Sequence, residues 1–377
     1  MYSVNNYIKK RGTNCHWKIY PKIEKKFSHA MVIPSYGEYE YLPNLLKSIE
    51  KNSSLILKEI VVIIIINNSE KTNKIIKDNN KKTYELLINN NFNFSIGIVD
   101  AFSKNLEIPH KNAGVGFARK IGMDLILPHL KNEHSLFFST DADTIIDKNY
   151  FQIIINYFNN NDVKAAVVGF KHIDFKKQSL KKEIIHYEKI LTETAIKIKD
   201  SGSPYGYVSM GSAMICDKNA YVSVGGMPKK KATEDFYFLQ ELTKYCGVHT
   251  INKILVYPSS RSESRVYLGT GYRMIETKKG FKITSLSYSE QAFSYLKKWL
   301  KIGTSSWNLN LTELLTKTTD VSVQLTNYII KENIELIWPK LQNTSSTKFH
   351  FINQFHCWFD GLKTIRFLKY FTFKSNL

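Results

Sequence analysis

Residues 60–66 read Ile-Val-Val-Ile-Ile-Ile-Ile, and the polar residues Asn67, Asn68 and Ser69 follow directly. An unbroken run of β-branched residues is typical of a central parallel strand whose two faces are both covered by helices. The polar residues after it are a turn signal and predict that the strand ends there. This segment predicts an α/β domain, in which ligands bind beyond the carboxyl ends of the strands.

Strands and helices alternate on both sides of this segment, through the first 145 residues. A helix is expected after residue 42, where leucine and isoleucine recur at helical spacing, and another is expected to end near Pro128. The first strand is expected to end at Pro34. The predicted strands are residues 30–33, 60–66, 95–99 and 136–139. Alternation of this kind predicts right-handed βαβ units and a Rossmann-like, mainly parallel sheet with helices on both faces.

After residue 150 the alternation of strands and helices is less regular. Strands are expected at 165–170, 208–216 and 254–256, and helices at 180–198 and 232–246. A loop rich in serine, arginine and glycine is expected over residues 258–280, and helices from about residue 285 onward. The predicted organisation is an N-terminal lead-in segment (1–28), an α/β domain (29–280) and a C-terminal helical region (281–377).

Composition and charge narrow the class of protein. The 377 residues are 43% hydrophobic and 13% aromatic, which is globular, and the formal charge is +20. Such a charge suits nucleic acid, an anionic membrane or an anionic substrate, but no basic block is dense enough to predict a nucleic-acid arm. The four cysteines lie far apart, which argues against a cysteine metal site. No signal peptide or long apolar run is evident, so a cytoplasmic location is expected, with peripheral membrane contact left open.

Two carboxylates follow the predicted strand 136–139, at Asp141 and Asp143, with Ala142 between them. Because alternate side chains of an extended chain point the same way, both carboxylates can converge on one point. Hard divalent cations prefer such oxygen ligands and often complete their coordination with water and phosphate oxygens. The pattern predicts a seat for a metal and a diphosphate, although simple turn capping gives the same spacing.

A second acidic pair, Glu234 and Asp235, follows Thr233 at the expected start of a helix. Thr233 is predicted to cap that helix through its side chain, and acids in a first turn stabilise the helix dipole whether or not they have another role. The loop beyond the next predicted strand carries Arg261 and Arg265, whose guanidinium groups suit phosphate oxygens. That loop is expected either to close over a ligand or to remain a solvated surface loop.

The order of these motifs resembles the family 2 glycosyltransferases, which have the GT-A nucleotide-sugar-binding fold. Four segments of residues 29–260 carry the likeness. They are the strand and turn at 32–36, the Asn/Gly-rich stretch 112–122 with its Ala-Arg pair, the Asp-x-Asp motif at 141–143, and the stretch 211–235 that ends in Glu-Asp. The sequence departs from the family pattern at residues 67–69, which are Asn-Asn-Ser. The family usually has an aspartate there that binds the nucleotide base.

The resemblance implies inverting transfer of a sugar from a nucleoside-diphosphate sugar to a hydroxyl acceptor. A glycan or a lipid-linked, cell-envelope intermediate is the expected acceptor, a hypothesis that fits the basic, aromatic segment 355–373. Asp235 is expected to be the base and Glu234 to orient hydroxyl groups, with Mn²⁺ or Mg²⁺ on Asp143 and Asp141. The residues expected to bind the donor are Pro34, Ser35, Tyr36, Glu38, Asn67, Asn112, Arg119, Asp141, Ala142, Arg261 and Arg265. Those expected on the acceptor side are Gly211, Ser212 and Gly226.

Other interpretations remain open. A retaining glycosyltransferase would share the metal site without needing Asp235 as a base, and a glycan- or membrane-binding module would share the fold without catalysis. A nucleotidyltransferase is disfavoured by the turn after Pro34, which lacks a glycine-rich, basic loop. Residues 355–373 mix aromatic and basic side chains, which suggests contact with an anionic bilayer. No role in nucleic-acid binding is expected.

Overall fold

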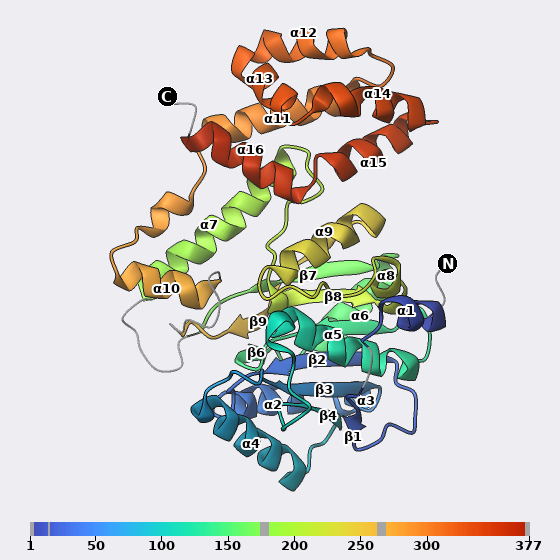
Figure 1. Cartoon of the computed structure of the whole chain (residues 1–377), viewed down its shortest axis with the longest axis vertical. Helices are drawn as coiled ribbons and strands as arrows, with labels where there is room; N and C mark the ends of the chain where they lie inside the picture. The colour runs from blue at the N-terminus through green and yellow to red at the C-terminus, as the bar shows by residue number, and fades with distance from the viewer. Residues whose placement is uncertain (1–3, 14–15, 174–180, 262–268, 374–377) are drawn as a thin grey trace. The chain divides into compact units, whose positions relative to one another are not determined.

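The computed structural model describes residues 4–13, 16–173, 181–261 and 269–373. It divides the chain into two compact units (Figure 1). The first, called the sheet unit here, comprises residues 1–185 and 209–281; the second, the helical unit, comprises residues 186–208 and 282–377. One boundary between the units follows residue 281, and residues 186–208 belong with the C-terminal helices.

The sheet unit is built on one mixed sheet of nine strands in the order β1-β4-β3-β2-β5-β8-β7-β9-β6. Strands β4, β3, β2 and β5 run parallel, whereas β8 is antiparallel to both β5 and β7, and β9 is parallel to β7 (Figure 1). The strands are β1 (Ile19–Tyr20), β2 (His29–Ser35), β3 (Ile60–Asn67), β4 (Ser95–Ala101), β5 (Leu136–Ser139), β6 (Thr144–Ile146), β7 (Ala165–Phe170), β8 (Met214–Asp217) and β9 (His249–Pro258). The predicted α/β architecture with a C-terminal helical region is confirmed.

Both faces of β3 are covered, as its composition predicts. Its eight residues are all buried, and Ile64 packs in a core cluster with Leu45 of helix α2 (Leu42–Glu50). On the opposite face, α5 (Val115–Ile126) lies so close that a Cβ on Gly122 would stand 2.4 Å from the Cδ1 atom of Ile65. Helices therefore enclose the central strands from both sides.

The remaining helices of the sheet unit lie between these strands in the chain, except α1, which precedes β1, and α10, which follows β9. They are α1 (Val4–Arg11), α3 (Ser54–Leu57), α4 (Lys74–Asn89), α6 (Tyr150–Asn160), α8 (Lys218–Ser223), α9 (Glu234–Cys246) and α10 (Thr270–Lys278), with the short 3₁₀ helices η1 (His110–Asn112), η2 (Leu127–His129) and η3 (Gly211–Ala213). Helix α7 (Lys181–Asp200) begins in the sheet unit and continues into the helical unit.

The helical unit has an aromatic core. Its elements are η4 (Ile283–Leu286), α11 (Glu290–Ser305), α12 (Leu311–Val321), α13 (Val323–Lys331), α14 (Ile334–Thr344), α15 (Lys348–Trp358) and α16 (Gly361–Phe373). Trp299, Phe355 and Phe367 are fully buried there. The aromatic residues of 355–373 are thus largely used inside the unit, and of the basic ones Arg366 and Lys369 are exposed. Among the described helices, none has both the length and the apolar character to cross a membrane.

Several local predictions were wrong. Strand β2 continues through Pro34 to Ser35. The carbonyl of Val32 faces the β5 side, where it accepts from Thr140, so the nitrogen of Pro34, two residues on, faces the same side. Pairing with β5 has already ended at Val32, so the missing N–H costs no ladder bond.

The structure also differs from the prediction in segments where the sequence pattern is weak. Residues 1–28 are more than a lead-in, because β1 pairs with β4 and Tyr7 of α1 is buried. The strand expected over 208–216 is the 3₁₀ helix η3 followed by the four-residue β8. Strand β9 is longer than predicted. Part of the expected loop 258–280 is helix α10, where Arg273 stacks on Phe281 (guanidinium carbon to ring centroid 5.4 Å).

Candidate active site

Polar side chains gather where the parallel strands end. Strands β2, β3 and β5 are neighbours in parallel register, with Ser35 opposite Ile66 and Val32 opposite Ser139. Ser35, Asn67 and Ser139 are the last residues of these strands. The three turns that the sequence placed at strand ends therefore lie along one edge of the sheet, where α/β proteins bind ligands.

This edge buries polar atoms that have no hydrogen-bond partner among the described residues. They are Ser35 Oγ, Asn67 Oδ1, Thr140 Oγ1 and Ser212 Oγ, and each side chain is at most 6% exposed. Leaving such an atom unsatisfied costs about 1–3 kcal/mol. A polar ligand that bonded to these atoms would recover that cost, so their presence together indicates a binding site.

The backbone at the end of β3 is held by Asn80 of α4, a residue that the sequence did not single out. Its side chain accepts from the N–H of Gly37 (2.9 Å) and donates to the carbonyl of Asn67 (3.0 Å) and to the side chain of Asn68 (2.9 Å). Asn80 is completely buried. It ties the turn after β2 to the turn after β3, and no local pattern marks an asparagine in a polar helix for such a role.

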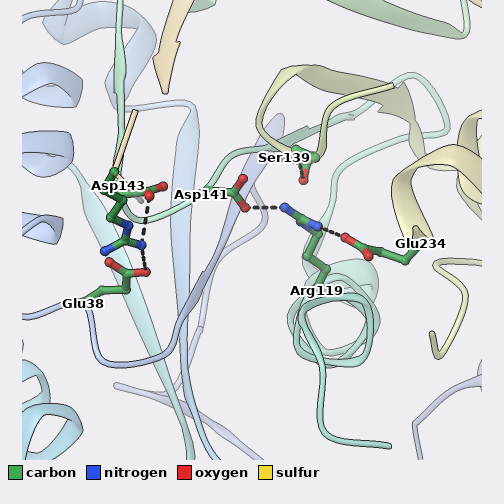
Figure 2. A network of polar contacts seen from close by, with 8 residues as sticks. Glu38, Arg119, Ser139, Asp141, Asp143 and Glu234 are labelled. Atoms are coloured by element: carbon green, nitrogen blue, oxygen red, sulfur yellow. Dashed lines mark hydrogen bonds and ion pairs between the residues drawn. The ribbon is translucent and has the colours of Figure 1, made fainter. Parts of the chain in front are cut away.

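The acidic motif after β5 presents its two carboxylates differently. Ala142 is buried in the core and anchors the turn, while the side chains of Asp141 and Asp143 are 36% and 18% exposed. Arg261 Nη2 lies 2.9 Å from Asp143 Oδ2 and donates to Glu38 Oε1 at 2.6 Å. Its guanidinium also stacks over the ring of Tyr41, 4.4 Å from the centroid. Glu38, predicted to bind the donor, is thus held beside Asp143 by this arginine (Figure 2).

Arg119 lies between the two acidic motifs. Its Nη1 donates to Glu234 and its Nη2 donates to Asp141, so one guanidinium group holds both carboxylates (Figure 2). The side chain is 1% exposed. The sequence suggested that Arg119 binds the donor; in the structure its guanidinium bridges two carboxylates.

Helix α9 begins with the second acidic pair. Thr233 does not cap it: its φ is +63°, and its hydroxyl donates to the carbonyl of Ala232 instead. Burial raises the pKa of Glu234 to about 7, although Arg119 opposes this rise. Burial likewise raises the pKa of Asp235, whose Oδ1 accepts from the N–H of Phe236 at 2.8 Å. Both carboxylates are therefore better proton acceptors than an exposed acid.

The Asn/Gly-rich segment packs against the chain that leads into α9. A Cβ on Gly114 would lie 2.5 Å from the Cα of Lys231, and one on Gly116 would lie 2.7 Å from the Cβ of Glu234. A Cβ on Gly211 would stand 2.3 Å from Arg119 Nη2. These glycines let the backbone come close to the acidic pair and its arginine.

A buried polar cluster supports the turn before α9. Lys120 pairs with Asp124 (3.1 Å) and donates to the hydroxyl of Tyr7 (2.6 Å), which in turn donates to Asp124 (2.8 Å). Gly226 has a φ of +76°, and a Cβ there would stand 1.9 Å from the Tyr7 hydroxyl. Gly226, expected on the acceptor side, is therefore a packing position under the N-terminal helix.

The remaining predicted residues are spread out. Asn112 ends η1, where its N–H donates to the carbonyl of Pro109 (2.8 Å). Tyr36 lies half-buried in the turn after β2, and Arg265 lies outside the described residues. The sequence also did not single out Tyr41 or Thr140, although Thr140 directly precedes the acidic motif and could have been suspected for that reason.

The described residues contain no group of three or more histidine, cysteine, aspartate or glutamate side chains that would hold a metal ion. Asp141 and Asp143 nevertheless fit a hard divalent cation, because their carboxylates are partly exposed at the ligand-binding edge. Magnesium sites commonly use one or two carboxylates and fill the other positions with water and substrate phosphates.

Comparison with known proteins shows only distant likenesses. No family model matches the chain. No curated protein matches it either. Among solved structures, S. aureus TarS 1-349 in complex with UDP-GlcNAc is 13% identical, with 88% of this chain and 89% of that chain covered and a TM-score of 0.45. Mannosyltransferase PcManGT from Pyrobaculum calidifontis, in complex with GDP-Man and Mn²⁺, is 13% identical, with 89% and 93% covered and a TM-score of 0.42. With likenesses this distant, the function has to be inferred from the site itself.

Proposed function

We propose that the protein is a glycosyltransferase of the GT-A type that moves a sugar from a nucleoside-diphosphate sugar to a hydroxyl group, with inversion at the anomeric carbon. One observation carries this proposal. One carboxylate from each of two distant acidic pairs, Asp141 and Glu234, is bound by the same buried guanidinium, that of Arg119, near the carboxyl edge of the sheet.

Asp143 and Asp141 are the residues that would hold a divalent cation such as Mn²⁺ or Mg²⁺. When bound, that cation would neutralise the charge that develops on the departing diphosphate. The unsatisfied side chains of Ser35 and Asn67 lie at the ends of adjacent strands and suit the polar groups of a nucleoside. Arg261, which now holds Asp143, is suited to a diphosphate oxygen for the same reason that it suits a carboxylate.

Asp235 is the proposed base. The acceptor oxygen forms a bond to the anomeric carbon while the bond from that carbon to the diphosphate oxygen breaks, and its electron pair leaves with the diphosphate. The acceptor proton passes to Asp235, whose raised pKa makes it a better base than an exposed aspartate. Glu234, fixed by Arg119, is proposed to orient the sugar or acceptor hydroxyl groups.

The acceptor is proposed to be a glycan or a lipid-linked, cell-envelope intermediate. For contact with an anionic membrane, the exposed Arg366 and Lys369 of α16 are the groups to consider. That contact would be electrostatic, because Phe367 and Phe371 of the same helix are buried in the helical unit.

The first test is a thermal-shift panel of UDP, GDP, CDP, dTDP and their sugars, with and without Mn²⁺. One nucleotide is expected to stabilise the protein in a metal-dependent way. With the matching donor, Asp235→Asn is expected to keep donor binding and to lose about 10²- to 10⁴-fold in transfer rate. Glu241→Gln, an exposed charge loss on the same helix, serves as the control.

Each other outcome has a definite meaning. Stabilisation by no nucleotide would remove the glycosyltransferase proposal and favour a binding module. Near-normal transfer by Asp235→Asn would remove the base assignment, and retention of the donor's anomeric configuration in the product would establish the retaining alternative.

A further inference from the structure

Arg119 is shared between two carboxylates that belong to opposite sides of the proposed reaction. Asp141 lies on the donor side and Glu234 on the acceptor side, 93 positions apart in the sequence by their numbering, and each accepts a bond from a different Nη of the guanidinium. With 1% of its surface exposed, this arginine has little access to water as an alternative partner. Any ligand that draws Asp141 away must therefore change how Arg119 holds Glu234.

The surroundings leave Arg119 little freedom to move elsewhere. The backbone of Gly211 lies directly against the guanidinium, since a Cβ there would be 2.3 Å from Nη2, and Ser139 Oγ donates to the carbonyl of Gly211 (2.8 Å). Gly116 packs in the same way on the side chain of Glu234. The guanidinium is thus confined between its two acidic partners.

Asp141 is the more exposed of the two partners. Its side chain is 36% exposed, whereas that of Glu234 is 5% exposed and packed against the start of α5. Asp141 can turn toward a cation or a ribose in the binding edge, while Glu234 has no comparable freedom. When one of the two ion pairs breaks, we therefore expect it to be the pair of Arg119 with Asp141, while the pair of Arg119 with Glu234 persists.

We propose that Arg119 is a positioning residue that couples donor binding to the acceptor side: when cation and donor take up Asp141, Arg119 is released to Glu234 alone and fixes that carboxylate. This inference rests on the proposed function. By reciprocity, Glu234 must then assist donor binding, because it competes with Asp141 for the same guanidinium. Glu234 would thus influence the binding of a nucleoside diphosphate, the part of the donor that it is not proposed to contact.

The test measures the affinity of Mn²⁺ together with UDP, GDP, CDP or dTDP for the intact protein. Glu234→Gln removes the competitor, so Arg119 should hold Asp141 more firmly and the affinity should fall at least about fivefold. Glu241→Gln, which removes an exposed charge from the same helix, should leave it unchanged. Arg119→Lys keeps the positive charge but lacks the two separate nitrogens that bind Asp141 and Glu234. In that background Glu234→Gln should lower the affinity by less than about twofold.

The outcomes separate this inference from the proposed function. Loss of affinity on Glu234→Gln in the wild type but not with Arg119→Lys supports the coupling. An unchanged affinity in Glu234→Gln overturns it while leaving the donor site intact, and an equal loss in both backgrounds shows that Glu234 acts without Arg119 and overturns it as well. If the wild type binds none of the four nucleotides, both the proposed function and the coupling fail. Circular dichroism of each variant verifies the fold.

Discussion

The two units of the molecule bury different kinds of side chain. The sheet unit buries several charged groups, which are Glu38, Arg119, Lys120, Asp124, Asp217 and Glu234. Among its described residues, the helical unit buries hydroxyl groups such as Thr318 and Thr326, which contact each other at 2.9 Å, but no lysine, arginine, aspartate or glutamate. Its interior is otherwise aromatic and aliphatic.

This difference separates an apolar core, which stabilises a fold, from buried charges, which need another explanation. A buried charge pays a desolvation penalty that its partner does not always recover, so replacing a buried ion pair by apolar residues is often neutral or favourable. Of these charges, Arg119 and Glu234 lie beside the unsatisfied polar atoms at the edge of the sheet, which makes them candidates for a functional role. The helical unit also has buried polar atoms without a partner among the described residues, such as the indole nitrogen of Trp299, but it buries no charged side chain there. We expect its core to matter for stability alone.

The largest expected effect is on the stability of the helical unit, and the sheet unit should stay folded. Phe355 is fully buried against Trp299 and Trp358, so Phe355→Ala should lower the free energy of unfolding of that unit by about 3–5 kcal/mol. Tryptophan fluorescence during denaturant unfolding reports mainly on this unit, because four of the five tryptophans lie in it.

Phe349, on the same helix and 74% exposed, provides the control, and Phe349→Ala should change stability by less than about 0.5 kcal/mol. Stabilisation by Mn²⁺ and nucleotide should persist in both variants. If Phe355→Ala abolished it while the sheet unit stayed folded, the two units would not be functionally separable.

The next effect concerns the sheet unit alone. Asp143→Ala should remove the metal-dependent stabilisation by nucleoside diphosphate, which amounts to about 2.7 kcal/mol at a ligand concentration 100-fold above Kd. Asp78→Ala, at an exposed position on α4, should retain the whole effect in the same thermal-shift assay. Undiminished stabilisation in Asp143→Ala would show that the nucleotide binds without this carboxylate.

The fold was largely predictable because its strands have strong local signals. The run 60–66 is β3, and the predicted strand 136–139 is β5 with identical bounds. Where the prediction of a strand failed, tertiary context decided: Pro34 stays in β2 because β5 no longer pairs at that point. The prediction of a side-chain cap at Thr233 failed because its φ of +63° turns the residue away from the capping conformation.

The site was predictable only as a set of residue types. The sequence identifies the acidic pairs and arginines but not their partners, since Arg119 lies 115 positions from Glu234 in the chain. Whether an arginine is exposed on a helix or buried between two acids depends on which other segments cover it. Arg119 is covered in part by η3, a segment without clear periodicity. Tyr7 and Asn80 were not foreseen because each acts through contacts with remote parts of the chain.

A smaller effect concerns the pH dependence of stability. Burial raises the pKa of Glu234 to about 7 in the folded protein, above the ordinary 4.5 that it regains on unfolding. Between these two values the folded state holds a proton that the unfolded chain has released, so this group's contribution to stability falls as the pH rises. Glu234→Gln cannot titrate.

The melting temperature of the wild type minus that of Glu234→Gln should therefore decrease from about pH 4.5 to about pH 7. Taking the difference cancels the contributions of titrating groups that do not interact with Glu234, including Asp217, whose pKa burial raises to about 6. A difference that stays flat or increases over this range would contradict the raised pKa of Glu234.

The smallest effect compares one helix start from each unit. Thr347 of the helical unit caps α15 by accepting from the N–H of His350 (3.1 Å), so Thr347→Ala should cost about 1 kcal/mol of stability. Thr233 occupies the equivalent position before α9 but makes no capping bond, so Thr233→Ala should cost well under about 0.5 kcal/mol. Denaturant unfolding of both variants makes the comparison. Equal costs would mean that the left-handed backbone at Thr233 relaxes in solution to allow a cap, and Glu234 and Asp235 would then begin α9 as ordinary first-turn acids.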